Sequence, residues 1–314
     1  MAKVYGIGET VYDILFKNNA PVGAVPGGSV YNSIVSLGRA GVPAAFISEV
    51  GNDRVGEIIL EHLRDSGVDT SAVCCFSDGK SPLSLAFLNE RGDADYVFYK
   101  DYPKNRLSVE FPTLERGDIL LCGSYFVLNP VLRSKVKPFL QYAREQGATI
   151  YYDINFRRNH IHEREALLPA IIENMELATV VRGSADDFRY LFGSTDGAEI
   201  YTSHIAPHCK NFIFTSGDGP VTLFTPLFTA QYPVAQVEVR STVGAGDNFN
   251  AGTVFGIWRE GLVHDSIDTL PREQWDKIIA CGLAFSAHAC TLLENYVDKV
   301  WAAKFVQGVK EGNI

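Results

Sequence analysis

The stretch Ser241-Thr242-Val243-Gly244-Ala245-Gly246-Asp247-Asn248-Phe249 is the most informative part of this chain of 314 residues. Apolar residues follow it at i, i+4 and i+7 spacing (Ala251, Phe255 and Trp258), and this spacing predicts a helix. Two glycines separated by an alanine let the backbone turn tightly before that helix. Successive N–H groups then point into one concavity at the positive end of the helix, which suits a phosphoryl group.

Asp247 falls in the first turn of the predicted helix. An acidic residue is common there because its charge complements the helix dipole. A carboxylate beside an anion nest is also where a general base would accept the proton of an attacking hydroxyl. The two interpretations are compatible.

Short apolar runs alternate with helical patterns for most of the chain, which predicts βαβ units around a mainly parallel sheet. The predicted strands are Val4–Gly8, Ala45–Val50, Ile119–Cys122, Ile150–Ile154, Thr179–Val181 and Phe212–Thr215. Predicted helices start near Val30, Val55, Val131, Glu163 and Ala185, and Gln274–Leu293 is a buried closing helix. We expect Val221–Phe224 and Ala235–Val239 to form an antiparallel edge of the sheet.

Two segments have strand-like alternation instead. Residues 11–25 look extended, and residues 82–102 form a predicted hairpin whose turn is Glu90-Arg91-Gly92-Asp93. We therefore expect one α/β domain over residues 1–314 that carries a small β-sheet lid, built from segments that are separate in the sequence.

Composition narrows the possible partners and compartment. The formal net charge of −9 disfavours nucleic acid and anionic membrane surfaces as partners. The first residues enter strand-like sequence at once and no apolar run is long enough to span a bilayer, so we expect no signal peptide and no membrane partner. The six cysteines fall at no metal-ligand spacing, which favours reduced thiols in a cytoplasmic protein.

Two further glycine motifs lie near the N-terminus. Gly27-Gly28-Ser29-Val30-Tyr31-Asn32 comes before a predicted helix, and Gly51-Asn52-Asp53-Arg54-Val55-Gly56 follows the next predicted strand. Together with the stretch around Gly244, they make the chain resemble the ribokinase family, also called the PfkB family of carbohydrate kinases, over nearly its whole length. The resemblance implies a ribokinase-like fold and ATP-dependent phosphorylation of a sugar hydroxyl, with Mg²⁺ as the cofactor.

The same resemblance implies an acceptor site. Asp13 takes the place of the family's acid that binds sugar hydroxyls, although a solvated turn aspartate is the alternative. Gly27, Gly28 and Asn32 resemble the sugar-contacting segment, because glycines admit a ligand close to the backbone and an Asn amide both donates and accepts. The alternative is that these glycines only turn the chain into a helix.

For catalysis, the resemblance makes Asp247 the general base and the amides of Gly244, Ala245 and Gly246 the anion hole. The motif Asp153-Ile154-Asn155-Phe156-Arg157 resembles the family's strand-end motif facing the phosphates, so Arg157 is expected to brace the transferred phosphoryl group.

Nucleotide and metal contacts follow from the resemblance as well. Ser184 and Asp187 stand where relatives carry an Asn and a Glu that organise magnesium, but Ser184 with Asp187 three residues later equally fits a helix N-terminal capping box. The segment after the predicted strand Phe212–Thr215 resembles the family's loop that holds the ribose and phosphates of the nucleotide. Its expected contact residues are Thr215, Gly217 and Gly219. Asn295 is expected at the purine edge.

Ser241 departs from the family pattern, in which an aspartate at this position helps to build a monovalent-cation site. Serine lacks the charge, so activation by potassium is doubtful. The exposed lid edge, with apolar positions such as Phe87 and Phe98, favours a homodimer formed through the lids.

The acceptor stays open among several classes. A fructose-like ketohexose is favoured by the resemblance, and a nucleoside kinase of the same family is the alternative enzyme. A keto-sugar acid would be met by a cation such as Lys100, Lys104 or Arg106, although these are more simply solvated charges on the lid. A catalytically idle sugar or nucleotide sensor is the alternative from another class.

Overall fold

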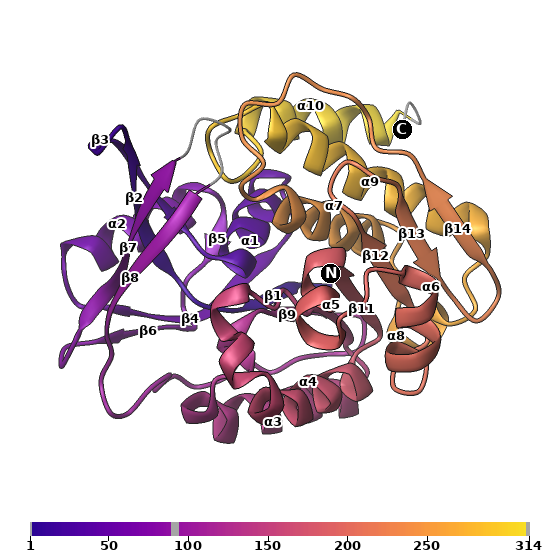
Figure 1. Cartoon of the computed structure of the whole chain (residues 1–314), viewed down its shortest axis with the longest axis horizontal. Coiled ribbons are helices and arrows are strands. Elements are labelled where there is room, and N and C mark those ends of the chain that lie inside the picture. The colour runs from indigo at the N-terminus through magenta and orange to yellow at the C-terminus, as the bar shows by residue number, and fades with distance from the viewer. Residues whose placement is uncertain (1, 89–93, 312–314) are drawn as a thin grey trace.

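The computed structural model describes residues 2–88 and 94–311. Its main sheet has the strand order β14-β13-β12-β11-β10-β9-β1-β4-β5, with β6 also paired to β4 (Figure 1). In chain order the strands are β1 (Val4–Ile7), β4 (Ala44–Gly51), β5 (Val68–Asp69), β6 (Val73–Phe76), β9 (Ile119–Gly123), β10 (Thr149–Asp153), β11 (Val180–Ser184), β12 (Phe212–Thr215), β13 (Val221–Phe224) and β14 (Thr229–Tyr232). All pairs are parallel except β12 with β13 and β13 with β14.

Helices cover both faces of this sheet (Figure 1). Each face of the sheet is apolar and needs a cover, because alternate residues of a strand point to opposite faces. In strand β9, for example, Ile119 and Leu121 belong to the apolar core on one face, and Leu120 and Cys122 belong to the core on the other face. The first core packs under α1 (Ser29–Arg39), α2 (Arg54–Asp65), α7 (Ala245–Arg259), α9 (Arg272–Cys290) and α10 (Lys299–Lys310). The second packs under α3 (Pro130–Glu145), α4 (Arg164–Leu177) and α5 (Ala185–Phe192).

A separate four-stranded sheet, called the small sheet below, stands at one side of the main sheet (Figure 1). Its order is β3-β2-β7-β8, formed by β3 (Ala20–Gly27), β2 (Val11–Lys17), β7 (Lys80–Leu88) and β8 (Ala94–Asp101). This confirms a small sheet built from two separated segments, with slightly wider bounds than expected. The turn predicted at residues 90–93 lies outside the described residues.

One predicted strand is wrong. Val221–Phe224 does form β13, but its antiparallel partner is β14, and Ala235–Val239 is not in a strand. Pro233 follows directly after β14, and because proline has no N–H it cannot continue a ladder.

In the described part of the chain, no helix combines the length and the apolarity that crossing a membrane requires.

Candidate active site

The turn before α7 is fixed by close backbone packing. Gly244 is the N-cap, with a φ of 80°, and a Cβ atom there would lie 2.5 Å from the carbonyl oxygen of Asn295. The Asn248 side chain closes the turn, because its Nδ2 donates to the oxygens of both Gly244 and Asn295 at 2.8 Å. Only glycine fits this position, so the sequence motif has a local structural cause.

Some backbone N–H groups at the start of α7 are hydrogen-bonded within the protein, and others are not. The Ala245 N–H donates to the Thr242 carbonyl at 3.2 Å, so it closes a turn and is not the free donor that was predicted. The N–H groups of Gly246 and Asp247 have no hydrogen-bond partner among residues 2–88 and 94–311. These two amides, together with the dipole of a 15-residue helix, leave an anion cradle.

Asp247 is held in a buried, hydrogen-bonded position. Asn32 Nδ2 donates to Asp247 Oδ2 at 2.8 Å, and Ser33 Oγ donates to the main-chain oxygen of Asp247 at 2.7 Å. Burial raises the pKa of Asp247 to about 6, while the Asn32 hydrogen bond and the charge of Arg157 act to lower it. The carboxylate is therefore ionised at neutral pH and still basic enough to take a proton.

Asn32 also offers an unused acceptor. Its Oδ1 atom is buried and has no partner within the described residues. A buried polar atom without a partner is costly, and a ligand hydroxyl would satisfy it. The amide therefore touches the general-base candidate with one atom and leaves the other for a ligand.

Asp13 lies at the same end of the site. Ser84 Oγ donates to Asp13 Oδ1 at 2.5 Å, and burial raises the pKa of Asp13 to about 6. A Cβ atom added at Gly27 would lie 2.8 Å from Asp13 Oδ2 and 3.6 Å from Asn295 Nδ2. This carboxyl is buried, unlike the solvated turn aspartate that was the alternative.

Gly28 and Asn295 complete this end. Gly28 has a φ of 133°, and a Cβ atom there would lie 2.3 Å from the Glu9 carbonyl oxygen, so this position requires glycine for backbone reasons. Asn295 was expected at a purine edge. A Cβ atom at Gly27 would be 3.6 Å from its side-chain amide, so Asn295 borders this glycine, and its contact with a purine stays a prediction.

A buried arginine joins the carboxyl ends of β10, β11 and β12. Arg182 Nη1 lies 3.1 Å from Asp153 Oδ1, and Nη2 donates to Thr215 Oγ1 at 2.7 Å. A Cβ atom at Gly246 would lie 3.0 Å from Arg182 Nη2, so the guanidinium borders the anion cradle. Burial alone would lower the pKa of Arg182, but Asp153 and Asp187 raise it, so the group stays charged.

Sequence reasoning missed Arg182, although a signal was present. It is a charged residue in the mostly buried strand β11, which pairs with β10 and β12, and its Nε has no partner in the described part of the chain. Asp153 is anchored from the other side, because Asn250 Nδ2 donates to Asp153 Oδ2 at 2.8 Å. A charge in a buried parallel strand needs a partner or a ligand.

Arg157 follows a distorted strand end. Asn155 has a φ of 41°, a left-handed conformation that turns the chain after β10. Arg157 itself is exposed, and its charge lowers the pKa of both Asp247 and Asp187. It therefore lies within electrostatic range of the cradle.

Ser184 and Asp187 form a capping box at the start of α5. The Ser184 N–H donates to Asp187 Oδ2 at 2.6 Å, and the Asp187 N–H donates to Ser184 Oγ at 3.3 Å. Burial and then the neighbouring Asp153 raise the pKa of Asp187. The described residues contain no group of three His, Cys, Asp or Glu side chains placed to hold a metal ion on their own.

The loop after β12 is a tight turn. Gly217 has a φ of 54°, and the Gly219 N–H donates to the Ser216 carbonyl at 2.7 Å. Thr215, the last residue of β12, is paired in register with Ser184. The structure thus brings Ser184, Thr215 and the cradle to one edge of the sheet.

The small sheet contributes a residue that was not predicted. Burial raises the pKa of the Tyr96 phenol to about 12, with Asp13 and Asp247 raising it further and Arg157 lowering it. Tyr96 is therefore within electrostatic range of both carboxylates of the site.

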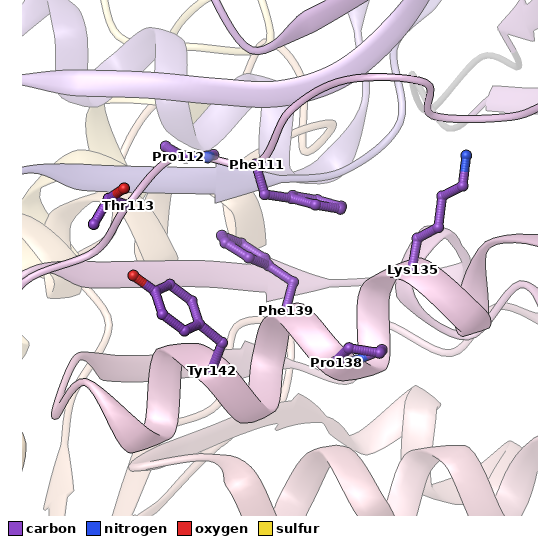
Figure 2. A pocket seen from close by; sticks show the side chains of 7 residues that line it. All are labelled: Phe111, Pro112, Thr113, Lys135, Pro138, Phe139 and Tyr142. Carbon is purple, nitrogen blue, oxygen red and sulfur yellow. The ribbon is translucent and has the colours of Figure 1, made fainter.

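A pocket of about 260 Å³ lies elsewhere, between α3 and the segment before β9 (Figure 2). Its Phe111 and Phe139 rings stack with centroids 4.5 Å apart, and the Lys135 ammonium at its margin donates to the Arg106 carbonyl. A second pocket of about 360 Å³ borders α6 (Gly197–Ile200) and the antiparallel edge of the main sheet. None of the residues predicted for the site lines either pocket.

Residues 1–292 match the family model described as pfkB family carbohydrate kinase. The chain belongs to this family. Its fructokinase relative from Rhizobium leguminosarum bv. trifolii is 28% identical over 82% of this chain and 80% of that protein. Family membership confirms the enzyme class predicted from the glycine motifs, a carbohydrate kinase.

Solved structures confirm the ribokinase-like fold of this pfkB family protein. Fructokinase from Vibrio cholerae O395, in fructose-, ADP- and calcium-bound form, superposes with a TM-score of 0.83 at 21% identity, covering 98% of this chain and 99% of that one. Aminoimidazole riboside kinase from Salmonella enterica, complexed with aminoimidazole riboside and an ATP analog, gives a TM-score of 0.82 at 21% identity, covering 97% and 99%.

Proposed function

We propose that this protein transfers the γ-phosphoryl group of ATP to a hydroxyl of a sugar, with a fructose-like ketohexose as the favoured acceptor. One observation carries the proposal: the buried Asp247 carboxylate lies directly beside two unpaired amides of the α7 N-terminus and accepts a hydrogen bond from Asn32. A base and an anion cradle are then side by side, as in-line phosphoryl transfer requires.

In this mechanism, the acceptor is held by Asp13, Asn32 and the backbone at Gly27 and Gly28. Asp247 takes the hydroxyl proton as the oxygen attacks phosphorus. The Asn32 Oδ1 acceptor orients a second hydroxyl of the sugar, since it is otherwise unpaired. Holding the hydroxyl near phosphorus supplies much of the rate by positioning alone.

Charge on the moving phosphoryl group is stabilised by the amides of Gly246 and Asp247, by Arg157 and by Arg182. Arg182 is already desolvated and fixed by Asp153, so it needs little reorganisation to serve this role. Gly244 contributes the turn that aims these amides.

Ser184, Thr215, Gly217 and Gly219 are proposed to line the nucleotide. Mg²⁺ is usually held by one or two carboxylates together with substrate phosphates, which fits a site with few protein ligands. Asp187 is the buried carboxylate that would hold it, and the ion would neutralise phosphate charge. Both oxygens of the neighbouring Asp153 are already engaged by Arg182 and Asn250.

An ADP-release assay with a panel of sugars tests this function. The wild type should release ADP only with ATP and an acceptor, and Asp247→Asn should lower kcat by about 100-fold or more while sugar and nucleotide binding persist. Near-normal turnover in this variant would remove the base assignment. Binding of both ligands without any ADP release by the wild type would favour the idle sensor.

A nucleoside is the second candidate acceptor, because the structurally similar aminoimidazole riboside kinase is complexed with a riboside. The keto-sugar-acid alternative rested on three cations. Two of them are engaged, since Lys100 pairs with Glu9 at 3.3 Å and Arg106 forms a buried pair with Glu49.

We also propose a homodimer formed through the small sheets. By strand register, one face of the small sheet, called the outer face below, carries Phe16, Leu85, Phe87, Val97 and Tyr99. Val97 and Tyr99 are 45% and 56% exposed, so an apolar surface is available for a second copy. Phe98, expected to share this role with Phe87, lies on the opposite face.

A further inference from the structure

Helix α1 carries a stripe of polar residues along a side that is buried. Asn32, Ser36 and Arg39 follow one another at i, i+4 and i+7, so they lie on one side of the helix. Asn32 and Ser36 are buried, and the Arg39 side chain is only 10% exposed. Buried polar groups need hydrogen-bond partners, and this stripe finds them in α7 and in the chain between α9 and α10.

Ser36 joins these two parts of the protein. Its Oγ donates to Asn248 Oδ1 at 2.6 Å and accepts a hydrogen bond from the Val297 N–H at 3.2 Å. Asn248 Nδ2 in turn donates to the carbonyl oxygens of Gly244 and Asn295. The chain just before α10 is therefore one wall of the tight turn that precedes α7.

Arg39 fixes this wall, which consists of residues 294–297. Its Nη1 donates to the Val297 carbonyl at 2.9 Å and pairs with Glu294 Oε2 at 3.3 Å, and the guanidinium lies 4.6 Å from the centroid of the Tyr296 ring. The Glu294 side chain is 55% exposed, so its ion pair contributes little. The bond to the Val297 carbonyl and the contact with the buried Tyr296 ring therefore fix the segment.

The guanidinium is itself held from its other side. Arg39 Nε donates to Ser66 Oγ at 3.3 Å. Burial and then the charge of Arg39 lower the pKa of His62 to about 4, so the imidazole is neutral at neutral pH and its Nε2 accepts from Arg39 Nη2 at 3.3 Å. His62 Nδ1 is bonded to the Tyr31 hydroxyl at 2.7 Å. All three guanidinium nitrogens have partners, and a lysine ammonium could not reproduce this arrangement.

We propose, on the basis of the function proposed above, that Arg39 is a positioning residue for phosphoryl transfer. It holds residues 294–297 against the turn before α7, and this turn sets the direction of the unpaired N–H groups of Gly246 and Asp247. Among the described residues, Arg39 hydrogen-bonds none of those proposed to bind sugar or nucleotide. Its loss should therefore misplace groups that act in the transition state and leave the binding of both substrates nearly intact.

Arg133 offers a matched control on the opposite face of the main sheet. Its side chain, on α3, is 15% exposed, its Nη1 donates to the Val127 carbonyl at 3.2 Å, and its Nη2 pairs with Glu173 at 2.7 Å. Arg39→Lys and Arg133→Lys thus remove the same kinds of contact. Urea unfolding should show that both variants fold and that both lose stability.

The ADP-release assay with fructose and ATP separates positioning from stability. Arg39→Lys should lower kcat by about 10- to 100-fold, with the KM values for both substrates within about twofold of wild type. Arg133→Lys should keep the wild-type kcat. Ser36→Ala, a smaller change that acts on the same segment, should also lower kcat at constant KM, so the test holds if Arg39→Lys folds poorly.

Hydrogen exchange measured by mass spectrometry follows the turn without turnover. Peptides covering residues 241–249 and 291–297 should exchange faster in Arg39→Lys and in Ser36→Ala than in wild type, and at the wild-type rate in Arg133→Lys. Equal losses of kcat in the two arginine variants, a raised KM at unchanged kcat, or unchanged exchange of these peptides would overturn the inference. If the wild type releases no ADP with any sugar, the proposed function fails, and the exchange rates alone then decide whether Arg39 positions the turn.

Discussion

Asn32 and Asp247 are 215 positions apart in the chain, and their side chains meet at 2.8 Å between Nδ2 and Oδ2. The contact joins the start of α1 to the start of α7. One hydrogen bond therefore connects Asn32, a residue predicted to contact the sugar, with Asp247, the candidate general base. It also sets an electrostatic balance, because burial raises the pKa of Asp247 while this hydrogen bond lowers it.

That balance predicts the acid side of the pH–rate profile. A general base must be deprotonated, so kcat should fall as the pH drops through about 6, the pKa of Asp247. Asn32→Ala removes a hydrogen bond that favours the charged form, and it should therefore move this fall to higher pH. Steady-state kinetics between about pH 5 and pH 9 would measure the shift.

Ser33→Ala is the matched control, because Ser33 bonds the main-chain oxygen of Asp247 and not its carboxylate. It should leave the midpoint in place. Asp13 has a pKa of about 6 as well, so Asp13→Asn tests whether the fall belongs to the other carboxyl. An unmoved midpoint in Asn32→Ala would argue against the proposed balance.

Asp247→Asn should stabilise the protein at neutral pH. The folded-state pKa of about 6 is above the unfolded value of 3.8, so the ionised carboxylate costs stability once the pH exceeds both values, and the cost vanishes below both. A difference of about two pKa units corresponds to about 3 kcal/mol in the free energy of unfolding at pH 7.5. Urea unfolding should show this gain at about pH 7.5 and its loss near pH 3 to 4. A less stable Asn variant at neutral pH would contradict the prediction.

Much of the fold could be predicted because each strand of the parallel sheet is a short apolar run bounded by turn residues. Phe212–Thr215 was predicted with its observed bounds. Strands β5 and β6, with two and four residues, were missed because so short a segment carries little periodicity. Ala235–Val239 has strand-like composition but no neighbouring strand to pair with, which only the tertiary structure determines.

The site was predictable where a motif requires a backbone conformation, as at Gly244 and Gly28. It was not predictable where side chains meet across the fold. Arg182 stands out in sequence only as a charge in an apolar strand, and its contact with Thr215 depends on strand order. Tyr96 depends on the register of β8 with β7, which periodicity alone does not give.

Arg182 should affect both stability and turnover, and the two effects can be separated. Arg182→Gln leaves Asp153 buried without its cation, so it should cost about 3 to 5 kcal/mol in the free energy of unfolding. Adding Asp153→Asn removes the uncompensated charge and should recover much of this loss. Urea unfolding of the single and double variants would measure it.

Turnover should not recover in the same double variant, because the positive charge beside the Gly246 amide is still missing. We expect kcat to stay about 100-fold below wild type, a loss typical for removal of one charge-stabilising group. A double variant that regains stability and activity together would show that Arg182 only balances Asp153.

Ser241 predicts independence from monovalent cations. Its Oγ accepts a hydrogen bond from the Val243 N–H at 3.2 Å, and its own N–H donates to the Cys290 carbonyl, so the residue serves the local backbone. Without a carboxylate here, replacing potassium by choline at constant ionic strength should leave kcat unchanged. Ser241→Asp should introduce a potassium dependence, and strong activation of the wild type by potassium would refute this account.

The outer face of the small sheet predicts the oligomeric state. Val97 and Tyr99 are exposed on β8, an edge strand of that sheet, and an uncovered apolar face beside free strand edges favours association with a second copy. Light scattering should give twice the chain mass for the wild type. Val97→Lys with Tyr99→Lys should give a monomer, because two charges would be buried without partners. Leu227→Lys, at an equally exposed leucine between β13 and β14, is the control and should remain a dimer. A monomeric wild type would exclude the interface, and a dimer that survives the double change would place it elsewhere.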